Sequence, residues 1–151
     1  MRFENTVTIA RPIADVFAYM TAIENLPTWQ EAILAATPTS TGVQGVGSTY
    51  TATAKALGRQ FEGAGEIVAW DPPRAYTLKS TSGPLLLTVT MTLTEVPAGT
   101  RVDGISEGEA RGVLRFVGAG LEPVLQRQAQ QDLERLKAVL ESRSAGSSTG
   151  A

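Results

Sequence analysis

The first candidates for chemistry in this chain are two carboxylates, Glu62 and Glu66, which lie four residues apart. A pair of carboxyl groups held close together can serve general acid and base catalysis. Both residues fall in an alternating stretch in which Phe61 and Ile67 mark the apolar face. Because successive side chains of a strand point to opposite faces, the two glutamates share the polar, outward face. We interpret them as solvated side chains rather than as a catalytic pair.

Few polar groups are expected on the inward faces of the predicted strands, and two tyrosines stand out. A phenol with a pKa near 10 is a good hydrogen-bond donor to a carbonyl or enolate oxygen and a poor base, so Tyr50 and Tyr76 fit that role. Asp132, at the edge of a helical stripe, is the nearby carboxylate that could act as a base. Asn5 and Ser106 also point inward. Such groups either satisfy a neighbouring hydrogen bond or orient a ligand in an otherwise apolar pocket, and both interpretations stay open.

Cysteine and histidine are both absent from the 151 residues. Their absence excludes disulfides and thiolate nucleophiles, and it removes the commonest metal ligand and the commonest general base. Only carboxylates remain as strong metal ligands, and none cluster on an inward face. The glycine pairs at 45/47 and 118/120 fit neither the phosphate-binding loop nor the dinucleotide fingerprint. We therefore predict no metal, no nucleotide and no other cofactor.

The composition is that of an ordinary globular domain, with 42% hydrophobic and 19% charged residues. A net charge of −2 gives no basic footprint for nucleic acid or for an anionic membrane. The longest apolar runs, such as residues 85–87, are far too short to span a bilayer, and the polar amino terminus lacks a signal-peptide core. We predict a cytoplasmic protein with no nucleic-acid partner and no stable membrane insertion. The sequence leaves the oligomeric state open, a homodimer included.

Apolar and polar residues alternate from residue 3 to residue 9, which predicts a half-buried first strand. Pro12 suits the first turn of a short helix. A second short helix is predicted to start near Pro27, with Trp29 as its buried side chain. Residues 32–39 could form a further strand, which Pro38 would confine to an edge or an end.

From Gly47 to Gly112 the alternation is continuous and predicts a series of antiparallel strands. Turn signals separate them at residues 57–59, 71–73, 82–84 and 97–100. Their inward faces carry unusually small side chains, among them Ala52, Ala54 and Gly65. A sheet that curls around a helix with so little bulk inside leaves space, so the pattern indicates a container.

A long helix closes the chain. Its apolar stripe follows helical spacing and consists of Leu121, Leu125, Ala129, Leu133, Leu136 and Leu140. Pro123 within this pattern indicates either a late start of the helix or a kink. Residues 142–151 are small and polar and are expected to be disordered. We therefore predict a single domain over residues 1–141, followed by a tail.

Several short motifs carry a resemblance to a known family. They are Ile9-Ala10-Arg11-Pro12 with Val16-Phe17, then Trp29, Gly47-Ser48, Gly58-Arg59, Trp70-Asp71-Pro72-Pro73-Arg74, Gly99-Thr100-Arg101-Val102 and Leu133 through Leu136-Lys137 to Leu140-Glu141. With them the chain resembles the START-like (SRPBCC) superfamily, and within it the bacterial polyketide cyclase/dehydrase branch. The resemblance implies an α+β helix-grip fold, in which a strongly curved antiparallel sheet wraps around a long carboxy-terminal helix, with two short helices after the first strand.

The resemblance and the small inward residues together lead to a functional hypothesis. We expect a small, largely apolar partner molecule, such as a lipid, a polyketide or an isoprenoid-like compound, to bind between the sheet and the last helix. The alternative is a cyclase or dehydratase, of lyase or isomerase type, that acts on such a molecule without metal or nucleotide. The residues expected to line the cavity are Asn5, Tyr50, Ala52, Ala54, Ile67, Tyr76, Leu78, Leu87, Val89, Met91, Ser106, Leu121, Leu125 and Gln128.

Overall fold

The structure is a computed structural model that describes residues 1–56 and 58–150, with only the backbone described for residues 113, 117–119 and 144–150. Seven strands are described: β1 (Arg2–Ile9), β2 (Ile33–Pro38), β3 (Thr49–Ala56), β4 (Arg59–Asp71), β5 (Ala75–Ser82), β6 (Leu85–Val96) and β7 (Gly99–Ala110). The helices are α1 (Ile13–Thr21), η1 (Ile23–Asn25), α2 (Leu26–Trp29), η2 (Gly112–Gly120) and α3 (Leu121–Gly150), where η marks a 3-10 helix.

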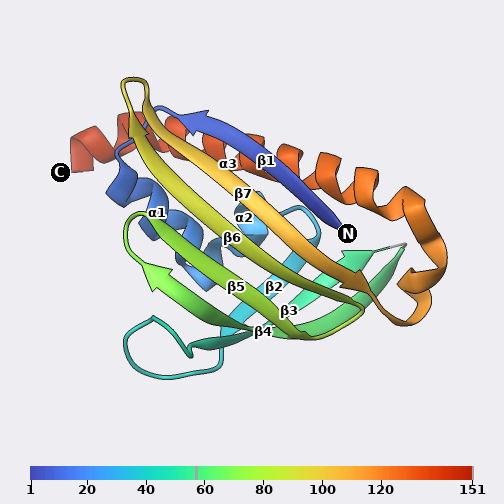
Figure 1. Cartoon of the computed structure of the whole chain (residues 1–151). Helices are drawn as coiled ribbons and strands as arrows, with labels where there is room; N and C mark the ends of the chain where they lie inside the picture. Colours follow the sequence, from blue (N-terminus) through green and yellow to red (C-terminus); the bar gives the residue numbers. More distant parts are fainter. Residues whose placement is uncertain (57, 151) are drawn as a thin grey trace.

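The strands form one antiparallel sheet in the order β1-β7-β6-β5-β4-β3-β2. The sheet is strongly curved, and α3 runs along its β1 edge (Figure 1). The short helices α1 and α2 pack into the same core as α3. This arrangement confirms the predicted helix-grip α+β fold. The expected edge strand is also present, because β2 ends at Pro38 and has a single strand neighbour.

The strand register places the predicted inward residues on one face. Val102 of β7 pairs with Val7 of β1 and with Leu93 of β6, and both Val102 and Leu93 are buried. The charged neighbours of Val102 in sequence, Arg101 and Asp103, lie on the opposite face and pair with each other at 2.9 Å. The small side chains of β7 therefore face the helix, as the alternation predicted.

The first turn of α3 accommodates its proline. The helix begins at Leu121, so Pro123 stands where a backbone N–H has no intrahelical partner. Of the two alternatives for Pro123, the structure has the proline in the first turn of the helix rather than at a kink within it. At its other end α3 continues as helix to Gly150, beyond the expected end near Glu141. The side chains of 144–150 and the whole of residue 151 lie outside the described part, and the division into a domain at 1–141 and a disordered tail at 142–151 stays a prediction.

The free edge of β1 is hydrogen-bonded to side chains of α3. Gln130 mimics a neighbouring strand: its amide accepts from the N–H of Thr6 at 3.3 Å and donates to the C=O of Thr6 at 2.8 Å. Next to it, the amide of Asn5 donates to the C=O of Gln126 at 2.9 Å and to the side chain of Gln130 at 3.2 Å. The Gln126 side chain in turn donates to the C=O of Glu4.

The same edge continues to the end of β1. The ammonium of Lys137 donates to the C=O of Thr8 at 2.8 Å, and the N–H of Ala10 donates to the Glu141 carboxylate at 2.9 Å. Lys137 and Glu141 also pair with each other at 2.6 Å. Positions 126, 130, 137 and 141 fall on one face of a helix. We call these four side chains the edge ladder, because they take the place of an eighth strand.

The edge ladder predicts a pH dependence of stability. The hydrogen bonds from Lys137 and from the N–H of Ala10 lower the pKa of Glu141 below its ordinary value of 4.5. A carboxyl group with a lowered folded pKa stabilises the fold above its unfolded pKa, and this contribution is lost as the pH falls through the folded pKa. We therefore expect the free energy of unfolding to drop below about pH 4.5, and Glu141→Gln to remove part of that drop.

Urea unfolding at a series of pH values between neutral and acid measures this dependence. Glu134→Gln is the matched control, because Glu134 is exposed on the same helix and forms no ion pair with any described residue. If the parent chain and Glu141→Gln lost stability in parallel on acidification, the ladder would not be the source of the effect.

Candidate functional site

The concave face of the sheet is packed at one end and open at the other. Opposite the second half of α3, the side chains are fully buried, with Leu136 and Ile9 both at 0% exposure. Opposite the first half of α3, inward side chains such as Val89 of β6 and Leu125 of α3 remain partly exposed. The closest backbone neighbours of α3 are β1, α2 and η2 rather than the middle strands. The helix therefore covers this end of the face incompletely.

The predicted lining residues divide accordingly. Those that are buried are Asn5, Ile67, Tyr76, Ser106 and Leu121. Those that remain partly exposed are Tyr50, Ala52, Ala54, Leu78, Leu87, Val89, Met91, Leu125 and Gln128.

The strand register brings many of them together in two rows across the inner face. One row runs through the paired positions Ile67, Leu78, Val89 and Ser106. The next row joins Tyr76 to Met91 and, through Gly104, to Asn5.

Tyr50 lies flat over a glycine on the neighbouring strand. It pairs with Gly65, and a Cβ atom added to Gly65 would stand 2.5 Å from the Tyr50 hydroxyl and 2.6 Å from the ring. Met91 covers Gly104 in the same way, with its sulfur 3.0 Å from the position of the missing Cβ. Large side chains on neighbouring strands thus occupy part of the space that the small inward residues leave.

Tyr76 stands in an aromatic cluster with Phe17 of α1 and Trp70 of β4. Its ring meets Phe17 edge-on at 5.7 Å between centroids, and Phe17 meets Trp70 in the same way at 5.1 Å. Burial raises the pKa of Tyr50, and burial together with the nearby Tyr50 raises the pKa of Tyr76. Both phenols are therefore protonated donors at neutral pH, and neither hydroxyl bonds to another described residue.

Two of the other polar candidates, Asn5 and Asp132, are held by hydrogen bonds. Both amide hydrogens of Asn5 are donated to α3, as described above. Asp132 accepts from the N–H of Glu31 at 3.2 Å and from Arg135 at 3.3 Å. Burial raises the pKa of Asp132 more than these partners lower it. Its contacts fasten α3 to the turn after α2, so the geometry favours a structural role over that of a base.

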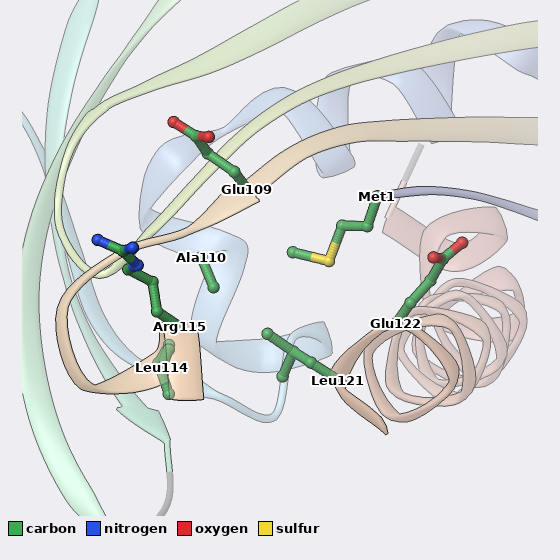
Figure 2. Close-up of a pocket in the computed structure, with 7 residues that line it drawn as sticks. All are labelled: Met1, Glu109, Ala110, Leu114, Arg115, Leu121 and Glu122. Atoms are coloured by element: carbon green, nitrogen blue, oxygen red, sulfur yellow. The ribbon is translucent and has the colours of Figure 1, made fainter. Parts of the chain in front are cut away.

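Two pockets open near the first residues of β6 and the last residues of β7, where β7 leads into η2. The first, of about 310 Å³, is lined by the side chains in Figure 2, where Met1 and Leu121 point toward a common space beside Ala110. Glu109, Arg115 and Glu122 surround it. The second, of about 340 Å³, lies over β5, β6 and β7. Its residues are Lys79, Ser80, Leu86, Leu87, Thr88, Glu107, Gly108 and Glu109.

Of the predicted lining residues, only Leu121 borders the first pocket and only Leu87 borders the second. Met1 and Leu114 also border the first pocket, although the sequence pattern does not predict them as lining residues. Residues 112–120 lack a clear period, and the buried side of this segment shows only once η2 folds back, with Leu114 at 3% exposure.

Comparisons with known proteins agree with this architecture. A family model described as polyketide cyclase / dehydrase and lipid transport matches residues 1–141. No curated protein matches the chain in sequence. None of the helices in the described part of the chain is both long and apolar enough to cross a membrane.

Solved structures share the fold at low sequence identity. TTHA0849 from Thermus thermophilus superposes with a TM-score of 0.81 at 16% identity, over 95% of this chain and 99% of that one. The Zhui aromatase/cyclase from Streptomyces sp. R1128 gives 0.77 at 17% identity, over 97% and 98%. The di-domain ARO/CYC StfQ of the steffimycin biosynthetic pathway gives 0.75 at 16%, over 95% of this chain and 51% of that one.

The contact between Tyr50 and Gly65 can be tested by substitution. Gly65→Ala places a methyl group on the Tyr50 ring, and we expect a loss of about 1 to 3 kcal/mol of stability from overpacking. Tyr50→Ala in the same chain removes the clash, so the two substitutions should be strongly non-additive in a double-mutant cycle. Gly45→Ala is the control, because its Cβ would meet Trp70 at an ordinary 3.8 Å. Additive effects of the first two would show that Tyr50 does not lie over Gly65.

Proposed function

The chain belongs to the polyketide cyclase/dehydrase and lipid transport family, and we propose that it binds a largely apolar small molecule between the concave face of the sheet and the first half of α3. One observation carries the proposal. Several inward apolar side chains near the start of the helix, among them Leu87, Val89 and Leu125, stay partly exposed, while Ile9 and Leu136 farther along it are fully buried. A ligand that covers this apolar surface removes it from water. Each Å² so buried contributes about 25 cal/mol to the free energy of binding, so the face favours an apolar ligand.

The chemistry of this face limits the kind of ligand. Among the inward positions of the described strands β3 to β7, charged groups fall only at two exposed strand ends, Arg59 of β4 and Glu95 of β6. The polar groups on this face include the hydroxyls of Tyr50 and Ser106, and the Tyr76 phenol is buried beside it in the aromatic cluster. A few donors in an apolar surround are typical of a small-molecule site. The face therefore suits a neutral lipid, polyketide or isoprenoid-like molecule with a hydrogen-bond acceptor. A cytoplasmic location and a homodimer remain predictions of the sequence.

Filling the open half should abolish binding. Val89→Trp places an indole on the concave face, and Thr90→Trp places the same indole on the opposite face of the same strand. With the dye 1-anilinonaphthalene-8-sulfonate and a flavanone as probes, we expect Val89→Trp to weaken binding about tenfold or more, which corresponds to about 1.4 kcal/mol. Thr90→Trp should bind like the parent chain. Titration calorimetry and native mass spectrometry measure both, and equal binding by the three chains would overturn the proposed site.

The second candidate function is that of a cyclase or dehydratase. The observation that favours it is the pair of unbonded phenols, whose proximity suits them to a carbonyl or enolate oxygen in a folded poly-ketone chain. No base is available in the form predicted, because Asp132 is held by Arg135 and by the backbone of Glu31. An enzyme of this kind would depend on holding the substrate in a reactive conformation.

Turnover of a model poly-β-ketone, followed by mass spectrometry for loss of water, distinguishes the two functions. For an enzyme, we expect Tyr76→Phe to lower turnover by about 100-fold or more, as for the loss of one oxyanion donor. Asp132→Asn, which keeps the acceptor for Glu31, should leave turnover unchanged. If the parent chain binds the compound without converting it, the binding function stands alone.

A further inference from the structure

The corner where η2 leads into α3 exposes apolar side chains. Phe116 of η2 is 88% exposed, and Val124 in the first turn of α3 is 52% exposed. Single exposed apolar residues are common on protein surfaces. A phenylalanine this far out of its own fold is unusual, because its ring gives up nearly all of the contacts that burial would provide.

The same corner is basic. Arg111, Arg115 and Arg127 are all exposed, and none forms an ion pair with a described residue. From residue 111 to residue 127 the chain has three arginines and one acidic residue, Glu122, a local charge of +2 in a chain of net charge −2. We call Arg111, Arg115, Phe116, Val124 and Arg127 the basic corner.

The basic corner adjoins the pocket of Figure 2. Arg115 borders that pocket, and so do the buried Leu114 and Leu121. Glu109 and Glu122 stand on the pocket's edge and offset part of the positive charge. In Figure 1 the corner forms one end of the molecule, and the β4–β5 turn and the loop before β3 lie at the other end.

We propose that the basic corner docks reversibly on the surface of an anionic lipid bilayer. Phe116 enters the headgroup region, and the arginines contact lipid phosphates. A protruding ring suits a fluid surface that closes around it, whereas a protein partner would need a pocket of matching shape. Docking in this orientation turns the pocket toward the bilayer. The docking itself does not depend on ligand binding in the concave face, so it can be tested separately.

Flotation of the full chain with vesicles tests the proposal. We expect binding to phosphatidylcholine vesicles that contain phosphatidylserine, and little binding to pure phosphatidylcholine. Raising the salt from about 0.1 M to about 1 M shortens the Debye length from about 10 Å to about 3 Å and should release the protein. Each arginine of the corner replaced by glutamine should weaken binding about fivefold, and Phe116→Ser about tenfold or more.

The matched control is the pair Val43→Ser and Arg74→Gln. Val43 is 98% exposed in the loop before β3, and Arg74 is exposed at the β4–β5 turn. These changes remove an exposed apolar side chain and an exposed guanidinium, the latter paired with Asp71, from the opposite end, and they should leave vesicle binding unchanged. As a second readout, Phe116→Trp should gain fluorescence that bromine-labelled lipids quench, beyond any quenching of the parent's two tryptophans.

Three outcomes would overturn the proposal. The parent chain fails to bind the phosphatidylserine vesicles, the control pair weakens binding as much as the corner variants do, or Phe116→Trp is not quenched. The first outcome would leave the basic corner to an acidic protein partner instead. Circular dichroism of each variant checks the fold, which should be intact because every substituted side chain is exposed.

Discussion

The free edge of β1 is the constraint on which the rest of this structure depends. An edge strand presents a row of unpaired N–H and C=O groups that must be paired or left to water. Here the edge ladder of α3 pairs five of them between Glu4 and Ala10, namely the C=O of Glu4, both backbone groups of Thr6, the C=O of Thr8 and the N–H of Ala10. The ladder fixes the position of α3 at the side of the sheet. A helix held at the edge cannot also lie over the middle strands, and the concave face is left for side chains, or a ligand, to fill.

Side-chain size decides how far the concave face is filled. At one end, Phe17, Trp70 and Tyr76 pack edge-to-face, and Leu136 and Leu140 of α3 close the core. At the other end the strands offer alanine and glycine, and the large residues that remain lie down on the glycines, as Tyr50 does on Gly65. Side chains therefore cover the concave face at this end without filling the space above it. Close packing and openness are thus separated along α3, which is firmly packed from Leu133 to Leu140 and less covered around Leu125.

Much of the fold could be predicted because its signals are local. The period of two in β6 and β7 defines the inward faces, and the glycines and prolines at the turns define the strand ends. The edge ladder could not be predicted, because glutamines four apart on a helix look the same whether they face water or a strand edge. Asp132 was a reasonable candidate base for its position near the apolar stripe. Its partner Arg135 lies one turn later on the same helix, but Glu31 comes from the turn after α2 and meets Asp132 only after packing.

The two ends of α3 differ in how firmly they are held to the rest of the fold. Near Glu141 the helix is fixed by an ion pair, by backbone contacts and by the buried leucines, so changes there cost stability. Near Leu121 the helix begins from η2, a nine-residue 3-10 segment, and such segments have poorer hydrogen-bond geometry than an α-helix. An exposed Phe116 and unpaired arginines stand at this less strongly held end. Surface contacts that would weaken a core can be placed here without cost to the edge ladder, and the proposed docking surface lies at this end of the fold for that reason.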